Sequence, residues 1–161
     1  MNQIEHDPGN HEVRMRMALQ QAQLAADAGE VPVGAIIFCG TRLIGRAHNQ
    51  VETLKDPTAH AEIIAITQAA SALGDWRLTG TTLYVTKEPC VMCAGAIVLA
   101  RIHTVVYGTV DPTRGGARSV FQVLDHPQLN HRTNIIEGIL GTECRSLLRS
   151  FFQNRRGENA G

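Results

Sequence analysis

Apolar residues recur at helical spacing near the start of the chain, where one helical face is formed by Val13, Met17, Leu24 and Ala28. Gly29 follows directly, and glycine is the usual residue just past the end of a helix. The pattern therefore predicts a first helix that begins at about Asn10.

Shorter runs rich in β-branched and aromatic residues predict five strands. Two of them, separated by Gly40-Thr41-Arg42, read as a β-hairpin. The predicted strands are Val33–Cys39, Leu43–His48, Thr81–Thr86, Thr104–Gly108 and Asn134–Ile136.

Three further helices are predicted between and after these strands. Asp56-Pro57 supplies an N-cap and a first-turn proline for a helix that runs to about Leu73, with His60 at its N-terminal end. The other two are Val91–Ala100 and Leu140–Arg156. A strand pair followed by strand–helix alternation indicates an α/β protein, a mixed sheet with helices on both faces.

The stretch Thr109–Arg132 has no helical or strand period and is rich in Gly, Pro and Asn. It predicts a long loop with one helical turn at about Val120–Leu124. Loops of this length are usually functional.

Length and composition support one globular domain. A chain of 161 residues is close to the rough prior of about 150 residues per domain, so we expect a single domain over residues 1–161. The ends, residues 1–9 and 157–161, are expected to be frayed.

Targeting features are absent from the pattern. No apolar run approaches the roughly 18 residues of a membrane span. The first ten residues carry Glu5, Asp7 and Pro8 where a signal peptide needs a basic, then apolar, start. We therefore expect a cytoplasmic protein, in which the four cysteines serve a metal or catalysis and not disulfides.

Charge is distributed unevenly along the chain. The formal net charge is +0, which argues against a generally basic nucleic-acid binder. Residues 1–100 nevertheless hold seven basic against ten acidic residues, and residues 101–161 hold eight against five. Only Lys55 and Lys87 among the 15 basic residues are lysines, and the arginine bias suits contacts with phosphates or bases.

Two short segments carry the candidate chemistry: His60-Ala61-Glu62 and Pro89-Cys90-Val91-Met92-Cys93. One imidazole and two thiolates are the three protein ligands of a catalytic zinc site, whose fourth position stays open for water. Cys39 and Cys144 have no partner at metal-site spacing, so an open site is favoured over a closed structural one.

Glu62 is the candidate general acid and base. Two thiolates cancel the charge of a zinc ion, so the metal alone acidifies water only weakly and a nearby carboxylate is needed to move protons. Positions i and i+2 diverge by about 200° on a helix, however, so spacing alone does not bring His60 and Glu62 together.

Each segment taken singly has another interpretation. A lone Cys-x-x-Cys can be a redox pair or two packed thiols, and a lone His-x-Glu is usually surface decoration. Their order, the proline before Cys90 and the helix start predicted at each segment favour a metal site.

The combination resembles the zinc-dependent nucleobase deaminases, whose signature is His-x-Glu followed by Pro-Cys-x-x-Cys. Over roughly residues 10–156 the chain is similar to the bacterial tRNA adenosine deaminases among them. The segments that carry this resemblance are Glu30–Ala35, Asn49, Asp56–Glu62, Leu83–Thr86, Glu88–Gly95, Asp125–Pro127, Asn130–Arg132 and Glu137–Leu140.

The resemblance implies a three-layer, cytidine-deaminase-like α/β/α fold with a five-stranded mixed sheet. It implies a homodimer that converts the wobble adenosine of a tRNA anticodon loop to inosine. It also implies one zinc ion per chain held by His60, Cys90 and Cys93, with Glu62 as proton shuttle and Asn49 contacting the base.

Two positions depart from the family pattern. Lys87 precedes Glu-Pro-Cys where an apolar residue is common, and Thr113-Arg114 lies in a loop where the family often has a lysine. The second departure concerns details of the RNA contacts and leaves the chemistry unaffected.

The last predicted helix has two different faces. Leu140, Cys144, Leu147, Leu148 and Phe151 form an apolar face. Roughly 140° away lies a stripe formed by Arg145, Arg149, Phe152 and Arg156. The stripe is either an ordinary solvated face or, because arginines around an aromatic suit single-stranded RNA, a candidate RNA contact.

Two alternatives to an RNA-acting adenosine deaminase stay open. The zinc motif is shared with deaminases of free bases, nucleosides or nucleotides, against which the arginine stripe and the Asn130-His131-Arg132 loop argue. A non-catalytic zinc module that only binds RNA is the other, and the presence of Glu62 disfavours it.

Overall fold

The computed structural model describes residues 8–159, which form five helices and five strands. In chain order these elements are α1 (Pro8–Asp27), β1 (Gly34–Cys39), β2 (Arg42–His48), α2 (Val51–Leu54), α3 (Ala61–Leu73), β3 (Thr81–Lys87), α4 (Val91–Leu99), β4 (Thr104–Thr109), β5 (Asn134–Glu137) and α5 (Gly141–Asn159).

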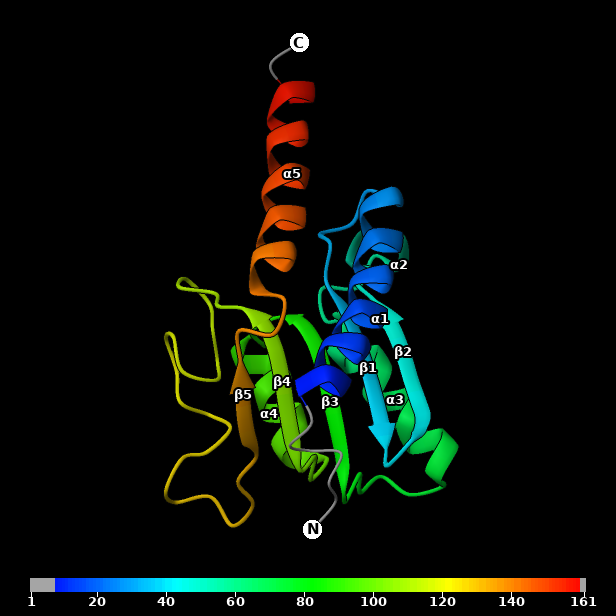
Figure 1. Ribbon diagram of the computed structural model, residues 1–161, viewed down its shortest axis with the longest axis vertical. Coiled ribbons are helices and arrows are strands. Elements are labelled where there is room, and N and C mark those ends of the chain that lie inside the picture. Colours follow the sequence, from blue (N-terminus) through cyan, green and yellow to red (C-terminus); the bar gives the residue numbers. More distant parts are fainter. Residues whose placement is uncertain (1–7, 160–161) are drawn as a thin grey trace.

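The strands make one mixed sheet in the order β2-β1-β3-β4-β5 (Figure 1). Strand β1 runs antiparallel to both β2 and β3, whereas β3, β4 and β5 are parallel. The carboxyl ends of β2, β3 and β4 consequently meet at one edge of the sheet. Ligand sites of open α/β sheets usually lie outside such an edge.

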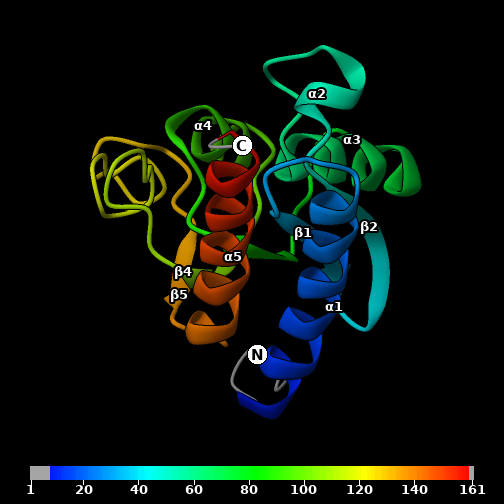
Figure 2. The same ribbon diagram turned by 90° about the horizontal axis from the view of Figure 1, so that it is seen from above.

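Helices cover both faces of the sheet, α1 and α5 on one side and α3 and α4 on the other (Figure 2). Successive side chains of a strand point to opposite faces of the sheet, so alternate strand residues belong to two different hydrophobic cores. The core under α1 and α5 includes Met15, Ile36, Tyr84, Val106 and Cys144. The core under α3 and α4 includes Ile37, Ala65, Leu83, Ile97 and Val105. The three-layer α/β/α prediction is confirmed.

Helix α1 lies unusually close to the sheet because β1 begins with a glycine. A Cβ on Gly34 would overlap the backbone of Ala18 and lie 2.6 Å from the amide nitrogen of Ala22. The contact fixes the start of β1, and with it the Glu30–Val33 segment that leads toward the site.

The predicted helix start at Asp56-Pro57 is wrong, since α3 begins at Ala61. Asp56 Oδ1 accepts hydrogen bonds from the Thr58 amide (2.8 Å) and hydroxyl (2.7 Å). An aspartate that bonds two residues ahead closes a local turn instead of capping a helix. His60 is therefore the N-cap of α3.

The helical turn predicted at Val120–Leu124 is also wrong, because that segment is irregular. The amides of Val120 and Phe121 both donate to the carbonyl of Gly115 at 3.0 Å. These bonds fold the segment back on the loop that precedes it.

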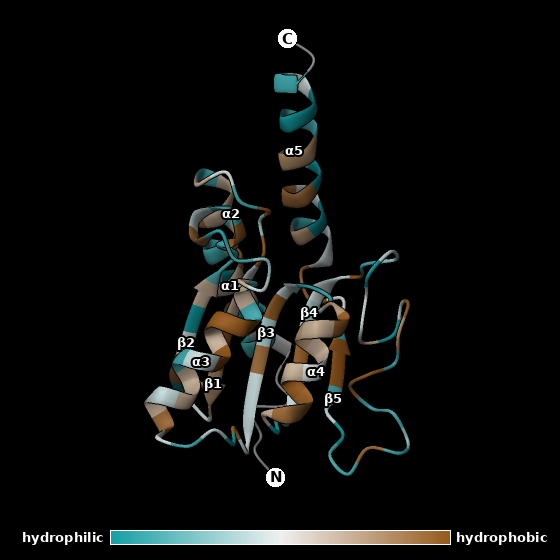
Figure 3. Cartoon of the chain, turned by 180° about the vertical axis from the view of Figure 1, so that it is seen from behind, coloured by the Kyte–Doolittle hydropathy of each residue, from teal (hydrophilic) through white to brown (hydrophobic). Residues whose placement is uncertain are grey.

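The ends are more ordered than predicted. Residues 8–9 and 157–159 are helical, and the remaining residues predicted to fray, 1–7 and 160–161, lie outside the described part of the chain. Helix α5 packs through its first turns, where Cys144 is buried, and its later turns stand away from the body of the protein (Figure 1). Hydrophilic residues dominate that outer part (Figure 3).

Across residues 8–159, none of the helices combines the length and the apolar character needed to cross a membrane.

Candidate active site

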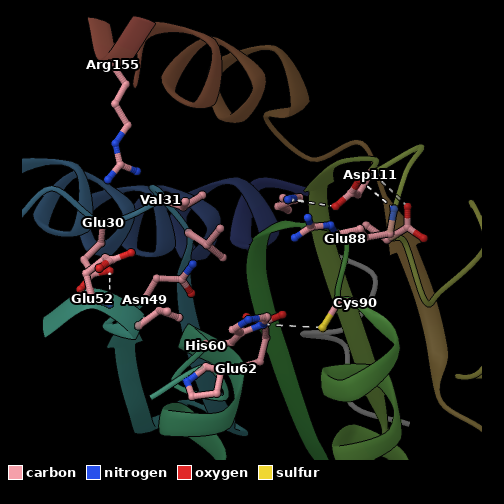
Figure 4. Close-up of a pocket in the computed structure, with 15 residues that line it drawn as sticks. Glu30, Val31, Asn49, Glu52, His60, Glu62, Glu88, Cys90, Asp111 and Arg155 are labelled. Carbon is pink, nitrogen blue, oxygen red and sulfur yellow. Dashed lines mark hydrogen bonds and ion pairs between the residues drawn. The ribbon is translucent and has the colours of Figure 1, made fainter. Parts of the chain in front are cut away.

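A cavity of about 320 Å³ opens at the sheet edge where β2, β3 and β4 end (Figure 4). Asn49 follows β2, Cys90 comes three residues after β3, and Asp111 comes two residues after β4. The cavity is lined by these residues and by Glu30, Val31, Val33, Val51, Glu52, Pro57, His60, Glu62, Lys87, Glu88, Arg114 and Arg155.

Two helix N-termini bring the predicted metal ligands together. His60 and Cys90 are the N-caps of α3 and α4, and neither side chain caps its own helix. Both side chains turn toward each other, with Cys90 Sγ 3.6 Å and Cys93 Sγ 3.4 Å from His60 Nδ1. These three ligand atoms all lie within 4.8 Å of one another.

This spacing fits a tetrahedral zinc ion. With Zn–N of about 2.0 Å and Zn–S of about 2.3 Å, the nitrogen and each sulfur of a tetrahedral site lie about 3.5 Å apart. Two soft thiolates and one imidazole are also the donor set that zinc accepts. The cluster can bind a metal ion through three ligands, and its fourth side faces the cavity.

The two thiols of the cluster differ in acidity. Hydrogen bonding with the Cys93 thiol, outweighing the effect of burial, lowers the pKa of Cys90 to about 3. The same hydrogen bond, together with burial, raises the pKa of Cys93. Cys90 is therefore a thiolate at neutral pH, helped by its place at a helix N-terminus, and a metal ion would replace the proton on Cys93.

Glu62 reaches the cluster because His60 is not helical. The N-cap backbone of His60 is extended (φ −76°, ψ 151°), so the divergence expected for two helical positions does not apply. Glu62 is buried, at 3% exposure, and burial raises the pKa of its carboxyl group. A carboxyl group whose pKa moves toward neutrality is suited to take up and release a proton.

Asn49 presents one end of its amide to the cavity. Its Oδ1 accepts a hydrogen bond from the Ala61 backbone amide at 2.8 Å, the first N–H of α3. The side chain therefore offers its NH₂ group, a donor, to a ligand. The predicted base-contacting residue lies in the cavity beside His60 (Figure 4).

Glu88 organises one wall of the cavity, a role that the sequence analysis missed. Its buried carboxylate accepts hydrogen bonds from the backbone amides of Asp111, Ala117, Arg118 and Ser119. It also accepts one from the Ser119 hydroxyl. Burial opposes ionisation, but these bonds outweigh it and lower the pKa of Glu88. A glutamate directly before Pro-Cys, with a long glycine-containing loop downstream, is the signal that could have suggested this role.

Glu30 plays the equivalent part on the opposite wall. It is 1% exposed and accepts from the Glu52 amide (3.0 Å) and from the Thr53 amide and hydroxyl (2.7 Å each). The carboxylate thus holds the start of the short helix α2 at the rim of the cavity.

The arginines of α5 divide into two groups. Arg149, Phe152 and Arg156 share a shallow depression with Arg155 and Asn159. Arg145 lies apart, in a depression with Gly108 and Glu137.

Arg155 was not predicted, yet it is the α5 residue that reaches the cavity (Figure 4). Its guanidinium lies 5.3 Å from the centre of the Phe151 ring, so it continues the apolar face of the helix. In the outer turns of α5, which do not pack on the sheet, this helix face borders the cavity instead of a hydrophobic core.

Removing an amino group from a nucleobase by hydrolysis needs a metal-activated water and a carboxylate that moves protons, within a pocket that admits the base. His60, Cys90 and Cys93 could hold such a metal ion, and the buried carboxyl group of Glu62 lies with His60 and Cys90 in a cavity that Asn49 helps to line. The fold and the site therefore define a nucleobase deaminase.

Comparison with known proteins narrows the class. The family model of the MafB19-like deaminases matches residues 9–156. The tRNA-specific adenosine deaminase of Bacillus subtilis is 44% identical over 145 residues, covering 90% of each chain. That of Aquifex aeolicus is 49% identical over 142 residues, covering 88% of this chain and 93% of its own. The chain belongs to this deaminase family and to the tRNA-specific adenosine deaminases.

Solved structures of deaminases are also similar to this chain. One, from a study of A-to-I editing by tRNA:A34 deaminases at the wobble position, superposes with a TM-score of 0.79 and 41% identity and covers 83% of this chain and 96% of its own. A guanine deaminase from Nitrosomonas europaea shares the fold, with 24% identity and a TM-score of 0.76, and the match covers 87% of this chain and 83% of its own. The expected family resemblance is confirmed.

Proposed function

We propose that this enzyme hydrolyses the wobble adenosine of a tRNA anticodon to inosine, using one zinc ion per chain held by His60, Cys90 and Cys93. The observation that carries the proposal is the buried Glu62 carboxyl group beside a three-ligand cluster whose open side faces the cavity. Membership of the tRNA-specific adenosine deaminases supports the choice of substrate.

Glu62 moves the protons of the reaction. When bound, zinc would supply the nucleophile by lowering the pKa of a water molecule. The Glu62 carboxylate accepts a proton as the nucleophile forms and donates it to the amino nitrogen leaving C6. Burial raises the pKa of Glu62, and a raised pKa favours a carboxyl group that both takes up and releases a proton.

Asn49 orients the base. With Oδ1 held by the Ala61 amide, the side-chain NH₂ donates to an acceptor nitrogen of the adenine ring. An adenine inside a duplex cannot reach such a cavity, and unstacked loop bases are the natural targets of proteins that act on RNA. An anticodon loop supplies an adenosine of that kind.

Helix α5 provides the proposed contacts with the RNA backbone. Arg149 and Arg156 flank Phe152, which is 43% exposed, and Arg155 links this surface to the cavity. Arg145 extends the basic stripe toward the body of the protein. Exposed arginines around an aromatic ring suit a single strand.

We also propose that the enzyme is a cytoplasmic homodimer that pairs through helix α4. Val91 and Leu99, on one face of α4 with Gly95 between them, are 49% and 70% exposed, and the space above Gly95 is open. An apolar helix face of this kind suits burial against a second copy. Sedimentation of the wild type and of Leu99→Glu tests this, because the variant should sediment as a monomer.

The experiment that tests the function compares three substrates. Zinc-loaded enzyme is incubated with an anticodon stem-loop, with the same stem-loop carrying cytidine at the wobble position, and with free adenosine, and the products are analysed as nucleosides. Inosine should form from the first substrate far more efficiently than from free adenosine, and the cytidine loop should stay intact. Comparable efficiency on free adenosine, or efficient formation of uridine, would instead identify a deaminase of free nucleosides or of cytidine.

A further inference from the structure

Lys87 forms an ion pair on the cavity wall that the deamination chemistry does not use. It is the last residue of β3, and its Nζ lies 2.9 Å from Asp111 Oδ2, with side-chain exposures of 27% and 8%. Both residues line the cavity.

Asp111 is held so firmly that it fixes the position of the ammonium group. Its other oxygen, Oδ1, accepts from the amide and hydroxyl of Thr113 (3.1 and 2.9 Å) and from the Arg114 amide (3.1 Å). The Asp111 amide in turn donates to Glu88 (3.1 Å). Asp111 is therefore a rigid anchor for Lys87.

Two of the other carboxylates that line the cavity, those of Glu30 and Glu88, are held by hydrogen bonds. Glu30 accepts hydrogen bonds from backbone amides of α2, and Glu88 accepts them from backbone amides of the loop after β4. Pairing with Asp111 uses one of the three N–H donors of Lys87, while the side chain stays partly exposed toward the cavity. Arg114 lies on the same wall, so this wall offers cationic donors to a ligand.

We propose that Lys87 contacts a phosphate flanking the target adenosine, with Asp111 as the residue that positions its ammonium group. The inference rests on the proposed function and specifies how the substrate is bound there. A compact, strongly hydrated ammonium suits a phosphate oxygen as a point charge. An ion pair is a costly way to fill a wall that apolar packing could fill, and a ligand contact accounts for it.

Three variants test the role: Lys87→Met, Lys87→Arg and the double variant Lys87→Met with Asp111→Asn. The double variant leaves the net charge of the protein unchanged and leaves no unpaired, nearly buried carboxylate. Kinetics with the anticodon stem-loop should show KM raised about tenfold in both Lys87→Met proteins, the loss expected for one charge-assisted contact. Lys87→Arg should stay close to the wild type.

Two further readouts separate binding from structure. The log–log salt dependence of RNA binding should become shallower by about 0.7 for each lost single-strand phosphate contact. Replacing the phosphate on the 5′ or the 3′ side of the adenosine by an uncharged methylphosphonate should weaken binding by the wild type but not by Lys87→Met. Arg77→Met is the matched control, because Arg77 lies beyond the far end of α3 and pairs with Asp75 (3.6 Å). It should behave as the wild type.

The proposal is overturned if neither methylphosphonate shows this coupling, or if the double variant regains wild-type KM and salt dependence, which would make the ion pair purely structural. Its failure is distinct from that of the proposed function. If the wild type forms no inosine from the stem-loop, the function fails; if it forms inosine and Lys87→Met does so with unchanged KM, only the role of Lys87 fails.

Discussion

The Glu88 carboxylate occupies the space that a side chain on Gly115 would need. Gly115 also forms an isolated antiparallel bridge with Cys90, and the Gly116 amide donates to the Pro89 carbonyl at 2.7 Å. The loop after β4 therefore packs directly against the segment that carries the proposed metal ligand Cys90. Substitutions in this loop should therefore alter metal binding.

Gly116→Ala should weaken both folding and metal binding. A Cβ at this position would lie 2.8 Å from the Cys90 carbonyl carbon and oxygen, so the backbone of Cys90 must move. Overpacking of this kind costs about 1–3 kcal/mol. Thermal unfolding and zinc titration measure the two effects. Gly157→Ala, in open space on α5, is the control, and equal behaviour of the two variants would show that the contact does not matter.

Removing a ligand should empty the metal site. Wild-type protein should contain one zinc per chain, and Cys90→Ala and Cys93→Ala should contain almost none, as measured by elemental analysis. Cys39→Ala, outside the cluster, should keep its zinc. Because the ligands bind in deprotonated form, acidification should also release the ion. Full zinc content in Cys90→Ala would refute the ligand assignment.

Glu62→Ala should retain zinc and lose turnover, because in the proposed mechanism this carboxyl group moves protons and does not belong to the ligand set. General acid–base groups contribute typically about 10²–10⁴-fold to rate, so kcat should fall by at least two orders of magnitude. Glu12→Ala, on the exposed surface of α1, serves as the control. A Glu62→Ala enzyme with a tenth of the wild-type rate would contradict the role.

Arginines of α5 should set part of the salt dependence of RNA binding. Arg149→Ala and Arg156→Ala should each make the log–log slope shallower by about 0.7–0.9 per lost phosphate contact. Arg145→Ala should have a smaller effect, since Arg145 lies in a separate depression. Titrations at several salt concentrations provide the measurement, and slopes equal to that of the wild type would make the stripe an ordinary solvated surface.

The cluster of His60, Cys90 and Cys93 was predictable from the sequence because its members belong to two short, recognisable motifs, although His60 and Cys90 lie 30 positions apart. His60 and Cys90 each stand at the start of a helix, and Cys93 lies one helical turn further on. What the sequence could not show are contacts between residues that belong to no such motif. The wall around Glu88 is made by residues 23 to 31 positions away.

The differences between the predicted and the observed helices also have specific causes. The start of α3 was misplaced because the turn made by Asp56 looks like a helix cap at sequence level. Arg155 was missed because the role of a helix face changes where α5 leaves the body, and periodicity carries no information about that point.

The hydrogen bond from the Ala61 amide to Asn49 has a consequence for selectivity. A free carboxamide can rotate by half a turn and present either a donor or an acceptor, so it distinguishes poorly between the edges of two bases. Here the first turn of α3 prevents that rotation, and the same turn carries Glu62 and follows His60. In the proposed mechanism, the group that reads the base and the groups that act on it are thus held together, so a base that does not match Asn49 would also be misplaced relative to Glu62.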